Sequence, residues 1–153
     1  MSSSGHHRVL IVGGGSAGIS VASRLGKSVD DIAVIDPATK HYYQPLWTLV
    51  GGGCADRETS ERSQASVMPK GVTWIREAVT AFDPEHDSLT TDSGSVIGYD
   101  VLVVCPGIQL DWDRIHGLSE TLGSDGVSSN YTLSLIHISE PTRQEASRMP
   151  SSA

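Results

Sequence analysis

The chain of 153 residues carries 11 Lys and Arg against 18 Asp and Glu, so its net charge is −7 with histidines neutral. That length suits one ordinary domain, and 38% hydrophobic residues can build a core, which excludes wholesale disorder. The acidic balance and the lack of clustered Lys and Arg disfavour nucleic-acid binding. No apolar run approaches the ~20 residues that cross a bilayer. Two distant cysteines exclude a disulfide scaffold or a Cys-x-x-Cys site.

The first predicted element is a buried strand. Residues 1–7 are polar, and we expect them to be disordered. Residues 8–12 (Arg-Val-Leu-Ile-Val) form an apolar, β-branched run that is typical of a strand with both faces covered. His6 and His7 are adjacent, but no Cys, His or carboxylate set accompanies them, so we predict no metal site.

A helix and a second strand follow this run. Glycines interrupt it over residues 13–18, and a helical period begins at Ser16. The predicted apolar face of the helix comprises Ala17, Val21, Ala22 and Leu25. Residues 32–35 (Ile-Ala-Val-Ile) are again β-branched and end at Asp36-Pro37. Strand, turn, helix and strand within about 30 residues predict a βαβ unit with a parallel sheet.

The remaining elements are shorter. An aromatic and apolar block over 40–53 ends in three glycines, and the polar stretch 55–64 is interpreted as a surface excursion. Another parallel strand is predicted at 72–75, and the most apolar run of the second half, 101–105, predicts a further strand. The segments predicted to form a small antiparallel meander are 78–83, 88–91 and 96–99. The fold class is therefore α/β, Rossmann-like.

The glycines of the first turn match the pattern G-x-G-x-x-G. Gly13, Gly15 and Gly18 follow a predicted strand and open a predicted helix, and Asp36 ends the next strand. In this pattern the first glycine permits a tight turn, the second lets the backbone approach a pyrophosphate, and the third lets the helix pack against the strand. Because the context is complete, we predict a dinucleotide site; the alternative is a glycine turn that binds nothing.

The ligand of this turn is predicted in part. Ser16 and Ala17 can present backbone N–H groups to phosphates at the positive end of the helix. The carboxylate of Asp36 can accept hydrogen bonds from both ribose hydroxyls and would repel a 2′-phosphate, which favours FAD or NAD over NADP. The motif by itself leaves FAD and NAD open.

The block Lys-His-Tyr-Tyr-Gln-Pro-Leu-Trp-Thr-Leu-Val-Gly-Gly-Gly at 40–53 resembles the signature after the second strand of sulfide:quinone oxidoreductases. Three later segments agree with that family, at 66–69, at 106–112 (Pro-Gly-Ile-Gln-Leu-Asp-Trp) and at 129–131. These enzymes belong to the FAD-dependent flavoproteins with two dinucleotide-binding domains. The resemblance covers roughly residues 8–133, and it favours FAD as the cofactor.

The resemblance implies roles for individual residues. It places Ser16 and Ala17 at the FAD phosphates, Asp36 at the adenosine ribose, Gln44 near the flavin, and Val79 at the adenine through its backbone. Asp36 stands where the family usually has Glu, and Pro106 stands where related flavoproteins have Thr or Ser, so only a backbone role is expected there. The predicted cofactor-binding residues are Gly13, Gly15, Ser16, Ala17, Gly18, Asp36, Gln44, Val79 and Gly107.

The implied activity is the oxidation of sulfide, with electrons passed through FAD to a quinone. The family uses a redox-active cysteine pair, which the resemblance places downstream of this segment, so neither Cys54 nor Cys105 is assigned a catalytic role. Full-length relatives are expected to be peripheral to the membrane, at the mitochondrial inner membrane in eukaryotes, and to contact it through a C-terminal region. For this chain itself a cytoplasmic location is expected, with no nucleic-acid partner.

The predicted domain is incomplete. Residues 8–133 are expected to form part of an FAD/NAD(P)-binding domain, and residues 134–153 to form a foreign, disordered tail, because the segment 134–143 resembles translated adapter sequence. We therefore expect the chain alone to bind FAD weakly or not at all and to lack sulfide oxidation. The alternatives are an NADH:quinone oxidoreductase or another pyridine nucleotide-disulfide-type oxidoreductase, a non-catalytic NAD-binding module, and a fragment without function.

Overall fold

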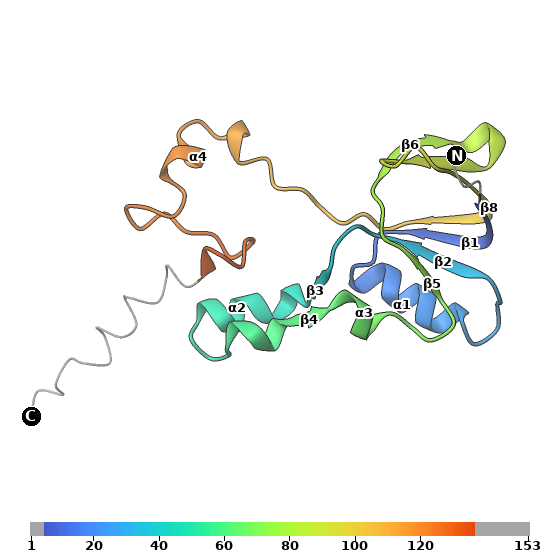
Figure 1. The fold of residues 1–153 in the computed structure, drawn as a ribbon. Helices are drawn as coiled ribbons and strands as arrows, with labels where there is room; N and C mark the ends of the chain where they lie inside the picture. Colours follow the sequence, from blue (N-terminus) through green and yellow to red (C-terminus); the bar gives the residue numbers. More distant parts are fainter. Residues whose placement is uncertain (1–4, 137–153) are drawn as a thin grey trace, which may run out of the picture. The chain divides into compact units, whose positions relative to one another are not determined.

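The computed structural model describes residues 5–136, which divide into two compact units. The first unit extends up to His41 and continues over Arg62–Gly107, and the second comprises Tyr42–Glu61 and the chain from Ile108 onward. The first unit contains the predicted βαβ region (Figure 1).

The first unit is built on a mixed sheet. Its strands are β1 (Gly5–Val12), β2 (Ile32–Ile35), β5 (Thr73–Ile75), β6 (Val79–Asp83), β7 (Ser88–Thr91) and β8 (Val96–Val104). They form one six-stranded sheet in the order β5-β2-β1-β8-β7-β6. β1 is parallel to β2 and β8, β2 is parallel to β5, and β7 is antiparallel to β6 and β8. The α/β fold class, the parallel βαβ unit and the antiparallel meander are confirmed.

Two strand boundaries differ from the sequence prediction. β1 begins at Gly5, so the prediction of disorder for residues 1–7 is wrong for 5–7, which pair with Ile97, Gly98 and Tyr99 of β8. β8 is a single strand over Val96–Val104 rather than two segments separated at Asp100. The carboxylate of Asp100 does not interrupt the strand, because it is exposed and lies 3.0 Å from Nε2 of His6.

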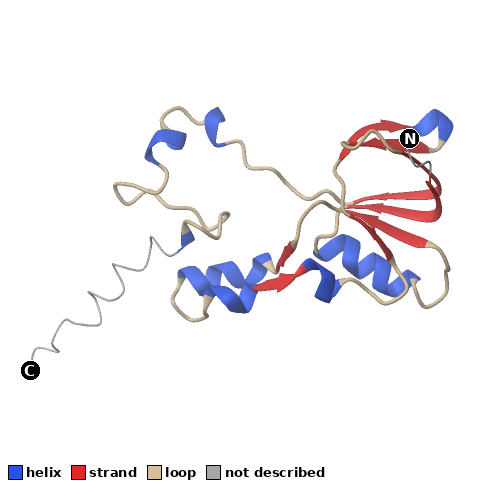
Figure 2. Ribbon diagram, viewed as in Figure 1, coloured by secondary structure: helices blue, strands red, loops and turns tan. Residues whose placement is uncertain are grey.

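Both faces of the sheet are buried at β2 and at residues 9–12 of β1, as these apolar runs predict. On one face, Val9, Ile11, Ile32 and Val34 pack with Ala22 of α1 (Ser16–Leu25). The residues of α1 turned to the sheet or its core are Gly18, Val21, Ala22 and Leu25, whereas Ala17, predicted on this face, is exposed. On the opposite face the cluster comprises Leu10, Val12, Ala33, Ile35, Leu89, Ile97 and Tyr99. There the sheet curves, so that β6 and β7 lie on the side away from α1 (Figure 2).

Short elements complete the chain. They are α3 (Gln64–Val67), η3 (Pro84–His86), η1 (Gln44–Leu46), α2 (Trp47–Gly51), η2 (Arg57–Ser60), η4 (Trp112–Arg114) and α4 (Leu118–Thr121), with β3 (Lys40–Tyr42) paired to β4 (Glu61–Ser63). The second unit has its own small core of Val50, Leu133 and Ile136. The domain boundary predicted at 133 falls inside this core, because Ile136 packs beside Leu133; residues 137–153 of the predicted tail lie outside the described residues.

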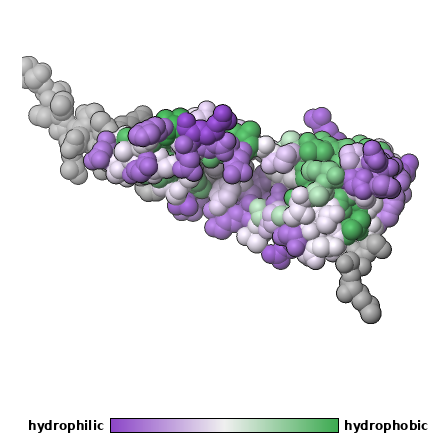
Figure 3. All heavy atoms as spheres, turned by 90° about the horizontal axis from the view of Figure 1, so that it is seen from above, coloured by the Kyte–Doolittle hydropathy of each residue, from purple (hydrophilic) through white to green (hydrophobic). Residues whose placement is uncertain are grey.

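The surface of the first unit carries both hydrophobic and hydrophilic residues. Figure 3 shows hydrophobic residues among hydrophilic ones on the sheet unit, and its exposed large hydrophobic residues include Phe82, Val96, Val101 and Val104. Between residues 5 and 136, no helix is long and apolar enough to cross a membrane.

Candidate functional site

The glycine turn is packed too closely for a side chain at three of its positions, Gly13, Gly14 and Gly18. Gly13 has a φ of +100°, and a Cβ there would overlap the carbonyl oxygen of Cys105. A Cβ on Gly18 would overlap the carbonyl oxygen of Gly13. The first glycine therefore brings the turn against the end of β8, and the third brings α1 against the turn. These are the roles predicted from the motif.

The N-terminus of α1 is open. Gly15 is the N-cap, no side chain caps the helix, and nothing lies within 4 Å of where a Cβ on Gly15 would stand. Ser16 and Ala17 follow in the first turn and are exposed. The first backbone N–H groups of a helix have no partner within the helix. This terminus can therefore bind an anion.

Asp36 connects the end of β2 to the glycine turn. Its Oδ2 accepts a hydrogen bond from the N–H of Gly14 at 2.5 Å, and its Oδ1 accepts one from the N–H of Ala38 at 2.7 Å. Its backbone oxygen accepts a bond from Nε1 of Trp74 at 2.9 Å. A carboxylate has about four acceptor positions. Asp36 can therefore hold the turn and still accept hydrogen bonds from a sugar.

A cavity of about 370 Å³ lies where the parallel strands β1, β2 and β8 end. Its lining residues are Val12, Gly13, Ile35, Asp36, Pro37, Glu77, Ala78, Val79, Phe82, Val104 and Pro106. Ligands of open α/β sheets bind at this edge, outside the carboxyl ends of the strands. The walls are mostly apolar, which suits a flat ring.

The charge of the cavity is negative. Asp36 and Glu77 are the charged residues of its lining, and Glu77 is held by a hydrogen bond from the hydroxyl of Ser93 at 2.9 Å. Two carboxylates in one cavity would repel an additional phosphate bound there. The lining therefore favours an unphosphorylated ribose.

The structure brings most of the predicted residues to this part of the first unit. Gly13, Asp36 and Val79 line the cavity, and Gly15, Ser16, Ala17 and Gly18 form the start of α1. Gly107 follows β8 with a φ of +82° and open space around it. Gln44 belongs to the second unit, where it is exposed at the start of η1.

Sequence reasoning missed two residues that contact the turn. Gln64 is 1% exposed, and its Nε2 donates a hydrogen bond to the carbonyl oxygen of Gly14 at 2.8 Å. Nδ1 of His41 lies 3.2 Å from the same oxygen. The only signal for Gln64 is its place at the end of a polar stretch, directly before apolar residues. That signal is weak, because Gln is common on surfaces.

Neither cysteine contributes its thiol to this site. Cys54 is exposed in the second unit, and Cys105 is partly buried after β8. Within the described part of the chain they form no disulfide. The oxygen of Cys105 is the atom that a side chain on Gly13 would meet. A contact through the backbone gives Cys105 no thiol chemistry.

Comparisons with known proteins agree with this geometry. The family model "Pyridine nucleotide-disulphide oxidoreductase" matches residues 7–137. The mitochondrial sulfide:quinone oxidoreductase of Dictyostelium discoideum is 51% identical over 128 residues, which is 82% of this chain and 28% of that protein. The mitochondrial sulfide:quinone oxidoreductase of Mus musculus is 41% identical over 133 residues, which is 86% of this chain and 30% of that protein.

A solved structure has a similar fold. The sulfide:quinone oxidoreductase of Aquifex aeolicus aligns with a TM-score of 0.71 and 25% identity, over 96% of this chain and 33% of that one. This chain thus spans less than a third of the length of the two curated relatives. The resemblance to sulfide:quinone oxidoreductases that the sequence motifs indicated is confirmed for the part of those proteins that this chain covers.

Proposed function

Because the chain belongs to the pyridine nucleotide-disulphide oxidoreductase family, which implies a flavin cofactor, we propose that it binds the ADP half of FAD as part of a sulfide:quinone oxidoreductase. Bound FAD would supply the two-electron redox chemistry between reduced sulfur and a quinone. The similarity to two mitochondrial sulfide:quinone oxidoreductases supports the assignment of sulfide and quinone as substrates, and the mitochondrial location of those relatives supports a mitochondrial location for this protein.

One observation carries the proposal: the open N-terminus of α1 and the carboxylate of Asp36 flank the same glycine turn. Gly15 leaves room for a diphosphate in front of the helix, and Asp36 lines the adjoining cavity. The residues present therefore fit the group. A diphosphate needs N–H donors, a ribose needs acceptors for its two hydroxyls, and adenine needs a mostly apolar cavity with backbone polar groups.

Each residue has a proposed task. The N–H groups of Gly15, Ser16 and Ala17 bind the diphosphate, and Asp36 accepts the ribose hydroxyls. The backbone at Val79, the first residue of β6, binds the adenine edge. Placement of the cofactor, rather than acid–base chemistry, is thus the work of these residues.

Two predicted contacts concern the rest of the cofactor. Gln44 near the flavin and Gly107 at a backbone approach follow from the family resemblance, and both remain predictions. No residue of this chain is proposed to form the redox cysteine pair.

The nucleotide test uses the 153-residue chain with three ligands: ADP, FAD and ADP-ribose 2′-phosphate. Calorimetric or NMR titration should show binding of ADP and weak binding of FAD. ADP-ribose 2′-phosphate should bind at least tenfold more weakly than ADP, because it would meet the carboxylates of Asp36 and Glu77. Equal affinity for the 2′-phosphate, or no binding of ADP, would refute the assignment.

A turnover assay tests the division of roles. The same chain, supplied with FAD, sulfide and a soluble quinone, should show no sulfide-dependent reduction of the quinone. Turnover that disappears in Cys54→Ser or Cys105→Ser would show that these thiols carry the sulfur chemistry and would contradict the proposal.

A further inference from the structure

The carbonyl group of Gly14 is held from inside the protein. Nε2 of Gln64 donates to this oxygen at 2.8 Å, and Nδ1 of His41 lies 3.2 Å from it. A carbonyl oxygen can only accept. The imidazole therefore contributes a hydrogen bond when Nδ1 carries the proton.

The orientation of this carbonyl decides where the next N–H points. In a trans peptide the C=O and the following N–H point in opposite directions. Because the oxygen of Gly14 is turned toward the buried Gln64, the N–H of Gly15 is turned away from it. Nothing lies within 4 Å of the ideal Cβ position on Gly15, at the N-cap of α1.

This peptide has little resistance of its own to reorientation. It joins two glycines, which adopt positive and negative φ with similar ease. The peptide before it is held separately, because the N–H of Gly14 donates to Oδ2 of Asp36. The hydrogen bond from a side-chain donor to the oxygen of Gly14 therefore favours the observed orientation of the Gly14–Gly15 peptide over the flipped one.

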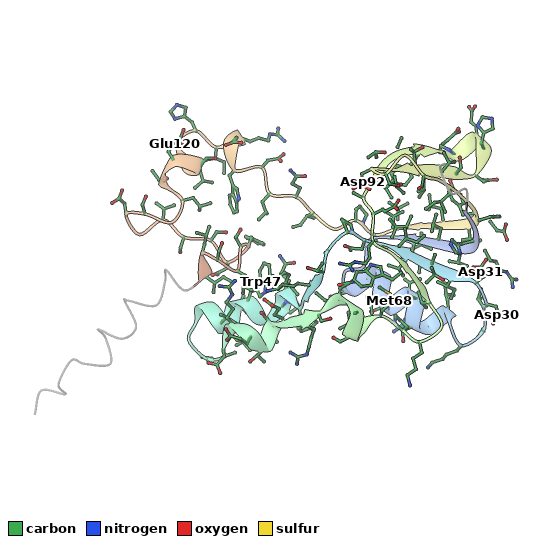
Figure 4. All side chains as sticks on the ribbon, viewed as in Figure 1. Asp30, Asp31, Trp47, Met68, Asp92 and Glu120 are labelled. Atoms are coloured by element: carbon green, nitrogen blue, oxygen red, sulfur yellow. The ribbon has the colours of Figure 1, made fainter. Side chains whose placement is uncertain are left out.

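Gln64 is itself well placed to hold the peptide. It is the first residue of α3, and its backbone N–H donates to the carbonyl oxygen of Thr39 at 2.9 Å. At the other end of α3, Met68 packs against the core under α1 (Figure 4). Burial to 1% exposure removes competing water from its amide. A hydrogen bond in such surroundings is stronger than one in water.

We propose that Gln64 is a positioning residue for the cofactor: it orients the Gly14–Gly15 peptide so that the N–H of Gly15 faces the diphosphate. The proposal rests on the proposed function, since it assigns a ligand to that N–H. His41 assists through the same oxygen. Gln64 does not touch the ligand; it acts through the backbone.

The test compares Gln64→Met, which keeps the length of the side chain and removes the donor, with Ser60→Ala. Ser60 is the matched control, because it is also 1% exposed and also donates to a backbone carbonyl, that of Arg57 at 2.8 Å. The probes are ADP and adenosine, titrated into the full chain. Adenosine lacks the diphosphate, so it reports the cavity alone.

We expect Gln64→Met to weaken ADP binding roughly tenfold, the effect of misdirecting one N–H donor to a charged group. Adenosine affinity should change less than about twofold, because the cavity is intact. Ser60→Ala should leave both affinities unchanged. A general loss of structure would lower both affinities together, so an unchanged ratio of ADP to adenosine affinity overturns the proposal.

A second measurement needs no ligand. In the NMR spectrum of the ligand-free chain, the carbonyl ¹³C resonance of Gly14 should shift in Gln64→Met and not in Ser60→Ala, because it senses hydrogen bonds to that oxygen. An unmoved Gly14 resonance overturns the proposal even if ADP binds. Failure of the unsubstituted chain to bind ADP refutes the proposed function instead.

Discussion

Replacing Asp36 by alanine tests whether this carboxylate holds the glycine turn as well as a ribose. The side chain accepts hydrogen bonds from the N–H groups of Gly14 at 2.5 Å and Ala38 at 2.7 Å. Hydrogen bonds to a charged group contribute about 1.5–3 kcal/mol each. Since Asp36 is partly exposed, water replaces part of each bond, and the lower value applies. The two bonds together predict a loss of about 3 kcal/mol in the free energy of unfolding.

Urea unfolding followed by circular dichroism measures this loss. With a slope of about 2 kcal/mol per molar urea, the midpoint of Asp36→Ala should fall by about 1.5 M. Asp92→Ala is the control, because exposed Asp92 also accepts a backbone N–H, that of Ala78 at 3.2 Å (Figure 4). Its midpoint should fall by less than about 0.5 M.

The same variant should also lose affinity for adenosine. Asp36 lines the cavity, and the proposed ribose contact ends with its carboxylate. Equal midpoints for Asp36→Ala and the unsubstituted chain would refute the view that Asp36 holds the turn. Unchanged adenosine affinity in a folded Asp36→Ala protein would refute the ribose assignment.

Four further substitutions follow from the geometry. Gly18→Ala should lower the free energy of unfolding by about 2 kcal/mol, measured by thermal or urea unfolding, because its Cβ would overlap the oxygen of Gly13. Gly15→Ala should lower it by less than about 1 kcal/mol but weaken ADP binding about tenfold, since the methyl group would occupy the anion site. A larger loss of stability in Gly15→Ala than in Gly18→Ala would contradict the assigned roles. Leu10→Ala should cost about 3 kcal/mol, because Leu10 is fully buried in the sheet core; a cost below about 1 kcal/mol would show that the core collapses around the gap. The pKa of Asp31 lies below its ordinary 3.8 because of its hydrogen bond with His7, so its contribution to stability is complete above that value and is lost as pH falls through the lower folded pKa. The difference in unfolding free energy between the unsubstituted chain and Asp31→Asn should accordingly shrink as the pH falls from about 5 to about 2. A difference that stays constant over this range would show that the contact between Asp31 and His7 does not cause it.

The glycine turn could be predicted because all its determinants are local. Gly13, Gly15 and Gly18 occupy positions fixed by one strand, one turn and one helix, and Asp36 ends the neighbouring strand. Hydrophobic periodicity identifies those elements from neighbouring residues alone. The carboxylate and the turn therefore meet in any fold that forms the βαβ unit.

Gln64 could not be predicted in the same way. It lies in a short helix that begins after a polar stretch, and its partner, Gly14, is fifty residues earlier in the chain. A buried glutamine and an exposed one have the same local sequence pattern. Only the path of the chain from β4 into α3, with the backbone bond to Thr39, brings this amide beneath the turn.

The continuity of β8 was missed for a related reason. The sequence pattern predicts 96–99 and 101–105 as separate segments, and Asp100, a residue type of low strand propensity, lies between them. Its side chain pairs with His6, a residue predicted to be disordered, so the two errors have one cause. The partner that accommodates the charge lies on a neighbouring strand and not in the local sequence.

The interleaving of the two units has a consequence for the order of folding. The small core of the second unit joins Val50 to Leu133 and Ile136, and the whole second part of the first unit, Arg62–Gly107, lies between them in the chain. On a ribosome, which releases the chain from its N-terminus, the βαβ sheet can therefore assemble while Val50 still lacks both partners. Closing so long a loop carries an entropic cost, and the glycine turn and the cavity beside it are complete before that loop is closed.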